Sequence, residues 1–554
     1  MAADLLLRGQ MMIPTATKLS LIAIVFFLII PPIAFITWDV SYLGFTNFEK
    51  LRVLFSKPYY FEIPFRNSII VCGISAVLST ILGLILAWLL ARRAFKREGT
   101  LLSLLTGPYV MPSFAMAIGW VLLWTKNGFF EKLSGLSSPI NPYGPLSMII
   151  IFALHNYPLA LLSIYTGLKN LSPEFEEAAR IHGIPSRTIS LKIILPLLRP
   201  HILSGFILAF AYSISEFGAP AVLGIPVGYP VLTTMIYSFM TVAPIEYELA
   251  EALSLVLSAI GITLLAVNYF VLKEKRYVAI TGKTARIEIK KGSKLGATLI
   301  VLILIFVYLP IASVVFGSFI KTIGLPINAE NIGLYHFQRV LNMSRVLNAL
   351  WTTMLVSISA ATIASLLGLL VAYTVVRGKG LESKIMDYVI FLPFSIPGLV
   401  IGVGLIVTSG RLYPIIYGTW AMLLLAFLIR FLPYATRTIE STLMQIDESL
   451  EEASRIHGAG FFKTLRGVVI PITLRAILSS WIFVFNSSVK ELSASAILSV
   501  QVETAIVVAF MMFSEGFFGD GAALTTILIA LTLATTWIFS KIAKIAVPEI
   551  APTA

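Results

Sequence analysis

Twelve long apolar runs are the feature that most constrains what this chain can fold into. A helix that crosses a ~30 Å hydrocarbon layer needs about 20 predominantly apolar residues. Runs of this length lie near residues 19–38, 66–91, 101–124, 145–168, 201–223, 247–272, 295–318, 351–376, 385–408, 413–437, 476–498 and 522–545. Only 12% of the 554 residues are charged, against about 25% in a soluble protein. The sequence therefore predicts an all-α polytopic membrane protein with about 12 transmembrane helices.

The excess of positive charge predicts the orientation of these helices. The net charge is +13, but clusters of basic residues follow spans two, six and eight and end span twelve, all on one side of the membrane if the spans alternate. They are Arg92, Arg93, Lys96 and Arg97, a cluster of lysines and arginines between 273 and 294, Arg377, Lys379 and Lys384, and Lys541 and Lys544. The 224–245 segment, between other runs, has no charge. This is the pattern in which cytoplasmic loops are basic. It predicts a multi-pass protein of the cytoplasmic membrane with both termini in the cytoplasm, with anionic lipid as a neighbour and no nucleic-acid partner.

The chain is an internal duplication. The stretch 176–196 matches 451–471, and the stretch 108–119 matches 393–404. The offset between matching positions is constant within each stretch and differs between the two stretches, because one loop is shorter in the second half. Six apolar runs separate the copies, and because six is even, the two copies have the same orientation in the membrane. This indicates a parallel repeat around a central pathway.

The duplication divides the chain into three parts. Residues 1–272 form a first half with spans 1–6, residues 273–294 form a basic cytoplasmic linker, and residues 295–554 form a second half with spans 7–12. The proline pairs of the repeated 108–119 and 393–404 stretches predict kinks in spans three and nine, because proline removes an intrahelical hydrogen bond.

A charged cassette occurs once in each half. The segments 172–183 and 447–458 each begin with a capping residue, Ser172 or Asp447, carry acidic residues in the first turn, and end in Gly183 or Gly458. These signals predict a short capped helix of about three turns. Two copies in the same frame favour a docking element over a merely solvated loop.

The cassettes resemble the signature of the membrane subunits of ATP-binding-cassette importers: E-A-A, a glycine, and an apolar stretch ending in proline. The two copies read Glu177-Ala178-Ala179…Gly183…Leu195-Pro196 and Glu452-Ala453-Ser454…Gly458…Ile470-Pro471, with Ser454 departing from the pattern. The segments Glu216–Gly224 and Lys490–Ala494 are similar to motifs of the fused, two-domain permeases of the ferric-iron and thiamine type. The resemblance covers nearly the whole chain.

This resemblance implies a type I (MetI-like) importer permease fold and a set of partners. Two separate ATPase subunits would dock on the cassettes, through Glu176, Glu177, Ala178, Ala179 and Gly183 in one and Glu451, Glu452, Ala453, Ser454 and Gly458 in the other. An extracytoplasmic binding protein would deliver the solute. Ferric iron is the first expectation for that solute, followed by thiamine, a phosphonate or a polyamine. ATP would bind to the partner, and this chain would bind no cofactor and catalyse no reaction.

Four ionisable residues lie within the apolar runs at repeat-related positions. Glu216 corresponds to Glu491, and His155 corresponds to Arg430, both at the offset that relates the two cassettes. Glu216 and Glu491 are about 15 residues, or ~22 Å, from the cytoplasmic end of their runs. Such residues cost about 2.5–3.5 kcal/mol at the centre of a membrane helix and are usually functional. They are candidates for the pathway or its gate, and the alternative is that they pair with each other or with Lys490.

The rival to the importer hypothesis is an ion-gradient-driven secondary transporter, which would use Glu216 and Glu491 and need no ATPase. The twin cassettes argue against it. The stretch Thr281–Thr284 contains G-K-T, but a phosphate-binding loop requires a glycine where Tyr277 stands. The five histidines form no cluster with ligand spacing, and the only cysteine, Cys72, excludes an intrachain disulfide. The sequence therefore predicts no nucleotide or metal site within this chain.

Overall fold

The computed structural model describes residues 14–46, 48–94, 98–172, 174–273, 290–291, 294–378 and 380–546. Helices dominate these residues, and the two strands among them, β1 (Arg93–Ala94) and β2 (Lys290–Lys291), form one short parallel pair. Helices are expected here because they satisfy their backbone polar groups internally where lipid cannot. The predicted all-α class is confirmed. The G-K-T stretch, most of the 273–294 linker and both chain ends lie outside the described residues.

Contacts divide the chain into two packing units. The first unit contains Thr46–Val340 and Ala509–Thr526, and the second contains most of α2 (Thr15–Thr46), Leu341–Val508 and the residues from Ile527 onward. The first helix of the chain thus packs with the second half. Correspondingly, α16 (Lys294–Gly317), the first helix of the second half, packs with the first half. The packing units therefore differ from the halves of the duplicated sequence. Each unit contains the first helix of the other half: α2 packs with the second half and α16 with the first.

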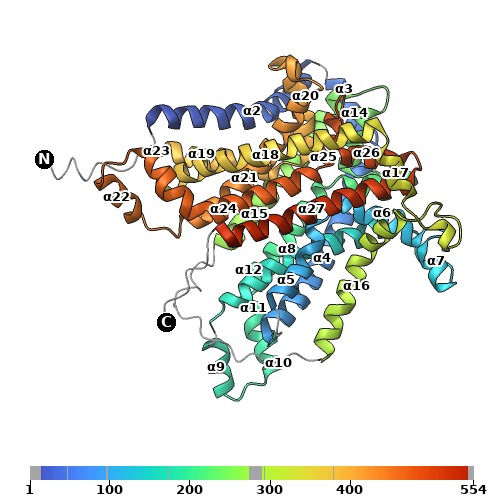
Figure 1. Ribbon diagram of the computed structural model, residues 1–554, viewed down its shortest axis with the longest axis horizontal. Coiled ribbons are helices and arrows are strands. Elements are labelled where there is room, and N and C mark those ends of the chain that lie inside the picture. Colours follow the sequence, from blue (N-terminus) through green and yellow to red (C-terminus); the bar gives the residue numbers. More distant parts are fainter. Residues whose placement is uncertain are drawn as a thin grey trace. The chain divides into compact units, whose positions relative to one another are not determined.

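The helices of the two units are given in chain order, as labelled in Figure 1. Besides α16, the first unit contains α3 (Phe48–Ser56), α4 (Glu62–Arg92), α5 (Glu98–Val110), α6 (Ser113–Trp124), α7 (Phe129–Ser134), α8 (Pro145–Asn170), α9 (Glu174–Ile181), α10 (Ser186–Ile189), α11 (Leu195–Leu197), α12 (Arg199–Ser215), α13 (Gly218–Leu223), α14 (Leu232–Thr241), α15 (Tyr247–Lys273) and α17 (Tyr335–Leu341). Besides α2, the second contains α18 (Ser344–Arg377), α19 (Leu381–Phe391), α20 (Gly398–Arg411), α21 (Trp420–Leu443), α22 (Ser449–Ile456), α23 (Phe461–Thr464), α24 (Ile470–Val489) and α25 (Ser493–Leu498). The last two helices, α26 (Ala505–Ser514) and α27 (Phe518–Ala546), contribute residues to both units.

Each unit is built around the same three-helix core. Helices α4, α8 and α12 pack together in the first unit, and α18, α21 and α24 pack together in the second (Figure 1). A glycine allows the closest approach in each core. A Cβ at Gly83 of α4 would lie 2.7 Å from the backbone nitrogen of Leu161, and one at Gly368 of α18 would lie 3.1 Å from that of Thr436. Small residues at helix contacts are the usual means of close packing in membranes.

Spans three and nine are broken, which confirms the predicted kinks. The axes of α5 and α6 differ by 87°, and those of the α19 and α20 segments differ by 109°. The breaks fall at Pro112 and Pro397, each of which directly precedes the helix that follows the break. Proline fixes its own φ and disfavours helical geometry in the residue before it.

The first helix of each half packs against a glycine of a broken span. A Cβ at Gly119 of α6 would overlap the carbonyl oxygen of Pro310 in α16, and one at Gly404 of α20 would lie 2.6 Å from that of Pro32 in α2. Glycine is therefore required where the two backbones meet. These two contacts show how each exchanged first helix is held in its unit.

Nine helices of the described residues are long and apolar enough to cross a membrane, or up to thirteen if each of four bent pairs is one span. The expected runs 201–223 and 476–498 are wrong as single spans. Helix α12 ends at Ser215 and α24 ends at Val489, and the apolar residues beyond each break belong to separate short helices. Apolar composition cannot distinguish these cases, because the short helices are buried and therefore as apolar as a span.

Candidate functional site

The two cassettes fold as matching short helices, α9 and α22. The Ser172 hydroxyl accepts a hydrogen bond from the backbone N–H of Glu174 at 3.3 Å, and the Asp447 carboxylate accepts one from that of Ser449 at 2.9 Å. The bond from Ser449 also holds the pKa of Asp447 below its usual range. Each predicted capping residue thus bonds a backbone N–H at the start of its helix, but the N-cap position of α22 is Glu448 rather than Asp447. Each helix has eight residues, about two turns rather than the predicted three.

Both cassette helices end at a glycine in the left-handed region. Gly183 has φ +74° and Gly458 has φ +78°, and a Cβ at either would meet nothing within 4 Å. Side chains are disfavoured there by backbone conformation alone. The helix ends therefore turn sharply while leaving open space around the turn.

One glutamate of each cassette, Glu176 or Glu451, points inward. Glu176 forms an ion pair with Arg92 at the end of α4. At the equivalent place in the second half, Arg377 Nε lies 2.9 Å from Glu451 Oε1, and the Tyr373 hydroxyl donates to Glu451 Oε2 at 2.7 Å. Glu451 is only 2% exposed. These glutamates anchor the cassettes to the preceding core helices.

Arg92 and Arg377 are repeat-related in the sequence, but their pairing with the cassettes was not predicted. Each follows an apolar run and precedes its cassette at a similar distance along the chain, and this recurrence was the available signal. Two positions that recur together in a duplicated chain are candidates for contact.

The outer face of each cassette helix combines acid with exposed apolar side chains. Glu177, Ala178, Glu452 and Ala453 are exposed, whereas Ala179 is buried and Ser454 is half-buried, with its hydroxyl 3.0 Å from that of Thr464. The apolar members of this face were not predicted. Ile181 and Ile456 are each 84% exposed, and a second repeat-related pair, Phe175 and Leu450, is exposed as well. Each cassette helix therefore exposes two large apolar side chains beside its acidic residues, at matching positions in the two halves.

The structure brings Arg430 and Glu491 together. Arg430 Nε in α21 lies 3.1 Å from Glu491 Oε2 at the break between α24 and α25, and Glu491 Oε1 accepts a hydrogen bond from the Ala494 backbone N–H at 3.0 Å. Glu491 is 5% exposed. A Cβ at Gly398 would overlap Arg430 Nη1, so the glycine makes room for the guanidinium.

Glu216 and His155 have different partners. Glu216 stands at the break between α12 and α13, not within a continuous span as expected, and its Oε1 accepts hydrogen bonds from the Ser113 hydroxyl at 2.6 Å and the Gly218 N–H at 3.2 Å. In α8, His155 has Nδ1 2.9 Å from Asn156 Oδ1 and Nε2 3.0 Å from the carbonyl oxygen of Met111. Within the described residues, Glu216 has no ion pair.

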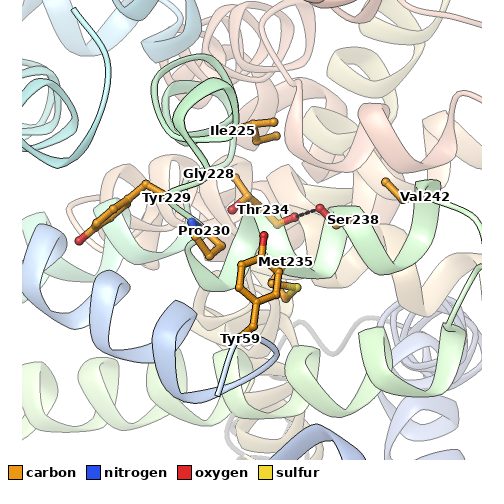
Figure 2. Close-up of a pocket in the computed structure, with 9 residues that line it drawn as sticks. All are labelled: Tyr59, Ile225, Gly228, Tyr229, Pro230, Thr234, Met235, Ser238 and Val242. Carbon is orange, nitrogen blue, oxygen red and sulfur yellow. Dashed lines mark hydrogen bonds between the residues drawn. The ribbon is translucent and has the colours of Figure 1, made fainter. Parts of the chain in front are cut away.

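A pocket of about 300 Å³ lies beside the hairpin formed by α13 and α14. Figure 2 shows its lining, with Tyr59 from the segment before α4 and the others from the hairpin: Ile225, Gly228, Tyr229, Pro230, Thr234, Met235, Ser238 and Val242. The hairpin, bent by 78°, is tied to Glu216, because the Thr233 hydroxyl donates to the Glu216 carbonyl oxygen at 2.9 Å. Among the described residues, no group of three or more His, Cys, Asp or Glu side chains is placed to hold a metal ion.

Comparison with known proteins places this geometry in a family. The family model described as binding-protein-dependent transport system inner membrane component matches twice, over residues 79–277 and 364–548. The first match contains the α5–α6 break, the cassette helix α9 and Glu216, and the second contains the corresponding α19–α20 break, α22 and Glu491. The chain is 28% identical to the ferric transport system permease protein FbpB of Actinobacillus pleuropneumoniae, over 95% of this chain and 77% of that protein.

Other relatives carry different names. A putative ferric transport system permease protein FbpB 1 of Haemophilus influenzae is 28% identical over 86% of this chain and 77% of its own length. The spermidine/putrescine transport system permease protein PotC of the same organism is 29% identical over 41% of this chain and 88% of its own length. Two matches of the family model, on a multi-pass helical chain with two cassettes, fit an importer subunit and not an ion-driven carrier. The chain therefore belongs to the binding-protein-dependent transport system inner membrane components, as a fused, two-domain permease of the ATP-binding-cassette type.

Proposed function

We propose that this chain is the membrane permease of a ferric-iron importer, which receives its cargo from an extracytoplasmic binding protein and is driven by two separate ATPase subunits. The observation that carries this proposal is the pair of matching cassette helices, each anchored inward by a glutamate and exposing the same acid and apolar residues outward. One polypeptide with two such surfaces suits two copies of one partner.

The cassette geometry explains how such a partner could move the permease. Ile181 or Ile456 would enter an apolar groove on the ATPase, and the neighbouring Glu177 or Glu452 would make directional contacts at its rim. The inward ion pairs, Glu176 with Arg92 and Glu451 with Arg377, link each docked helix to the end of α4 or α18. Closure of the ATPase dimer would thus be transmitted to the core helices and convert the pathway between inward-facing and outward-facing states.

The cargo is proposed from the relatives. The two ferric permeases match along most of this chain, whereas relatives named for sulfate and for spermidine/putrescine match 36% and 41% of it. Ferric iron is therefore the first candidate, ahead of thiamine, a phosphonate or a polyamine. Under this proposal the chain binds no cofactor and catalyses no reaction, and ATP is hydrolysed on the partner subunits.

The proposed orientation follows from the basic segments of the sequence. Both termini and both cassettes face the cytoplasm, where the ATPase is, and the α13–α14 hairpin faces the binding protein. Anionic lipid neighbours the basic side of the membrane.

The test is purification of the tagged chain in mild detergent, with identification and counting of bound proteins, followed by transport in vesicles. We expect two copies of an ATP-binding-cassette ATPase per chain, and uptake of ferric iron that requires both ATP and the loaded binding protein. Recovery of the chain without an ATPase would contradict the coupling proposal. Uptake of another solute in place of ferric iron would contradict only the cargo.

A further inference from the structure

The two halves place an acidic and a basic residue at repeat-related positions but arrange them differently. Glu216 corresponds to Glu491 and His155 corresponds to Arg430, at the offset of the cassettes. Ser113 corresponds to Gly398, at the offset of the proline-containing stretches. The two sites therefore differ at two positions, with histidine and serine in the first half where the second half has arginine and glycine.

Both carboxylate oxygens of Glu491, the acid of the second half, have a partner. Arg430 reaches Glu491 through the space that Gly398 leaves, so that one carboxylate oxygen has an ion pair at 3.1 Å and the other has a backbone hydrogen bond at 3.0 Å. The side chain is buried and its charge is already balanced by Arg430, so a further cation would have to compete with the guanidinium.

In Glu216, the acid of the first half, only one carboxylate oxygen has hydrogen-bond partners. Both hydrogen bonds that the Glu216 carboxylate accepts, from Ser113 and from Gly218, are on Oε1. Oε2 has no hydrogen-bond or ion-pair partner within the described part of the chain, and the residue is half-buried rather than buried. The two ring nitrogens of His155 lie next to Asn156 and Met111 instead.

The surroundings of Glu216 supply further oxygen atoms. The chain is unwound between Ser215 and Gly218, and the Ser113 hydroxyl lies 2.6 Å from the carboxylate. Carboxylate, hydroxyl and carbonyl oxygens are the ligands that hard cations prefer. Broken helices at membrane depth are where transporters commonly bind their substrates.

We infer that Glu216 is a transient ligand for a hard cationic cargo during its passage, whereas Glu491 is held in a structural ion pair. This inference rests on the proposed function and deepens it by naming one residue that contacts the cargo. A single carboxylate with few additional oxygens binds weakly, which suits a pathway, because a site that conducts must also release.

The experiment uses the complete importer in vesicles, with ferric iron loaded on the purified binding protein as the probe. Uptake and ATP hydrolysis are measured together. We expect Glu216→Gln, which keeps the shape and removes the charge, to lower iron uptake at least about tenfold, while two ATPases still bind and hydrolysis still responds to the loaded binding protein. The matched control is Arg430→Met with Glu491→Gln, which removes the second-half pair together and should keep most of the uptake.

A second variant covers the case in which Glu216→Gln does not insert normally. Ser113→Gly with His155→Arg copies the second-half arrangement and should close Glu216 with an arginine, lowering uptake while the carboxylate remains. Wild-type iron uptake in both variants would overturn the inference and leave the proposed cargo standing. Failure of the unmodified importer to take up iron, with uptake of an anionic solute instead, would overturn both.

Discussion

The ion pair between Arg430 and Glu491 depends on a residue that has no side chain. Gly398 begins α20, and the space above its Cα is occupied by the guanidinium of Arg430. The acid at the break of α24 is thus stabilised by a residue on a third helix, which contributes only room. Because Arg430 occupies the space that a side chain at 398 would need, we expect substitution of Gly398 to be tolerated only if Arg430 is replaced as well.

We predict that Gly398→Ala destabilises the chain by about 1–3 kcal/mol, the usual result of adding a methyl group to a filled site. The added Cβ would displace Arg430 and leave Glu491 without its cation. Thermal unfolding of the purified chain in detergent measures the effect. Gly410→Ala, in the same helix but with nothing within 4 Å of the added Cβ, is the control and should unfold as the wild type does. Equal stability of the two variants would show that Arg430 can bond Glu491 from another position.

Gly119 makes a similar test possible for the exchanged first helix. A Cβ there would overlap the Pro310 carbonyl oxygen, so Gly119→Ala should push α16 away from α6. We expect a lower unfolding temperature and easier proteolysis within the first unit. Gly99→Ala, where the structure leaves open space, serves for comparison. Unchanged proteolysis of Gly119→Ala would mean that α16 is not held by this contact.

At the scale of elements, the cassette helices have two faces with separate tasks. The inward face carries the ion pairs of Glu176 and Glu451. The outward face carries the exposed isoleucines and glutamates of the two copies: Ile181, Ile456, Glu177 and Glu452. Variants of the two faces should therefore fail in different ways.

The outward face should determine binding of the partner. We predict that Ile181→Asp with Ile456→Asp reduces the amount of ATPase recovered with the tagged chain at least about tenfold, because an apolar anchor is replaced by a charge. Leu133→Asp, at a similarly exposed leucine of α7, should leave recovery unchanged. Full recovery with the double variant would argue against docking through these residues.

The inward face should determine how well movement of the ATPase is passed on to the core helices α4 and α18. We predict that Glu451→Gln leaves the ATPase bound but lowers the amount of solute carried per ATP several-fold, because Arg377 loses its charged partner and the cassette its link to α18. The ratio of uptake to hydrolysis in vesicles checks this. Glu49→Gln, at an exposed position of α3, is the control. A normal ratio would show that Tyr373 and the helix ends suffice to hold α22.

The sequence predicted the cassettes well because capping residues and terminal glycines act locally, and their outcome depends on few distant contacts. It also located the breaks of spans three and nine, since proline acts on its own helix. It failed at Glu216 and Glu491, where the apolar run continues past the end of the helix. Whether the chain unwinds there depends on hydrogen bonds from other helices, such as the one donated by Thr233, and periodicity carries no information about these.

At the scale of the whole molecule, the duplication could be identified from residue offsets alone. The exchange of first helices could not, because Pro32 and Gly404 lie far apart in the sequence and neither has a charge or motif that indicates a partner. The orientation in the membrane remains a prediction from the basic segments.

A cysteine-labelling experiment tests that orientation. Cys72 is the only cysteine, so a Cys72→Ser chain can carry single cysteines at exposed positions. We expect Ser449→Cys, at the start of α22, to react with an impermeant reagent only after the membrane is opened. Leu136→Cys, in the loop after α7, should react in intact cells. The reverse pattern would place the cassettes outside and exclude their docking to a cytoplasmic ATPase.

The exchange of first helices also means that α2 is synthesised long before the helix against which it packs. Helix α2 leaves the ribosome early, but Gly404, which its Pro32 contacts, is synthesised only after the whole first half of the chain. At about 5–20 residues per second, α2 waits on the order of tens of seconds in the bilayer without its partner. Its survival in that interval depends on lipid and on the insertion machinery rather than on its final neighbours. Joining the two halves in one polypeptide guarantees that the helix it waits for arrives from the same ribosome.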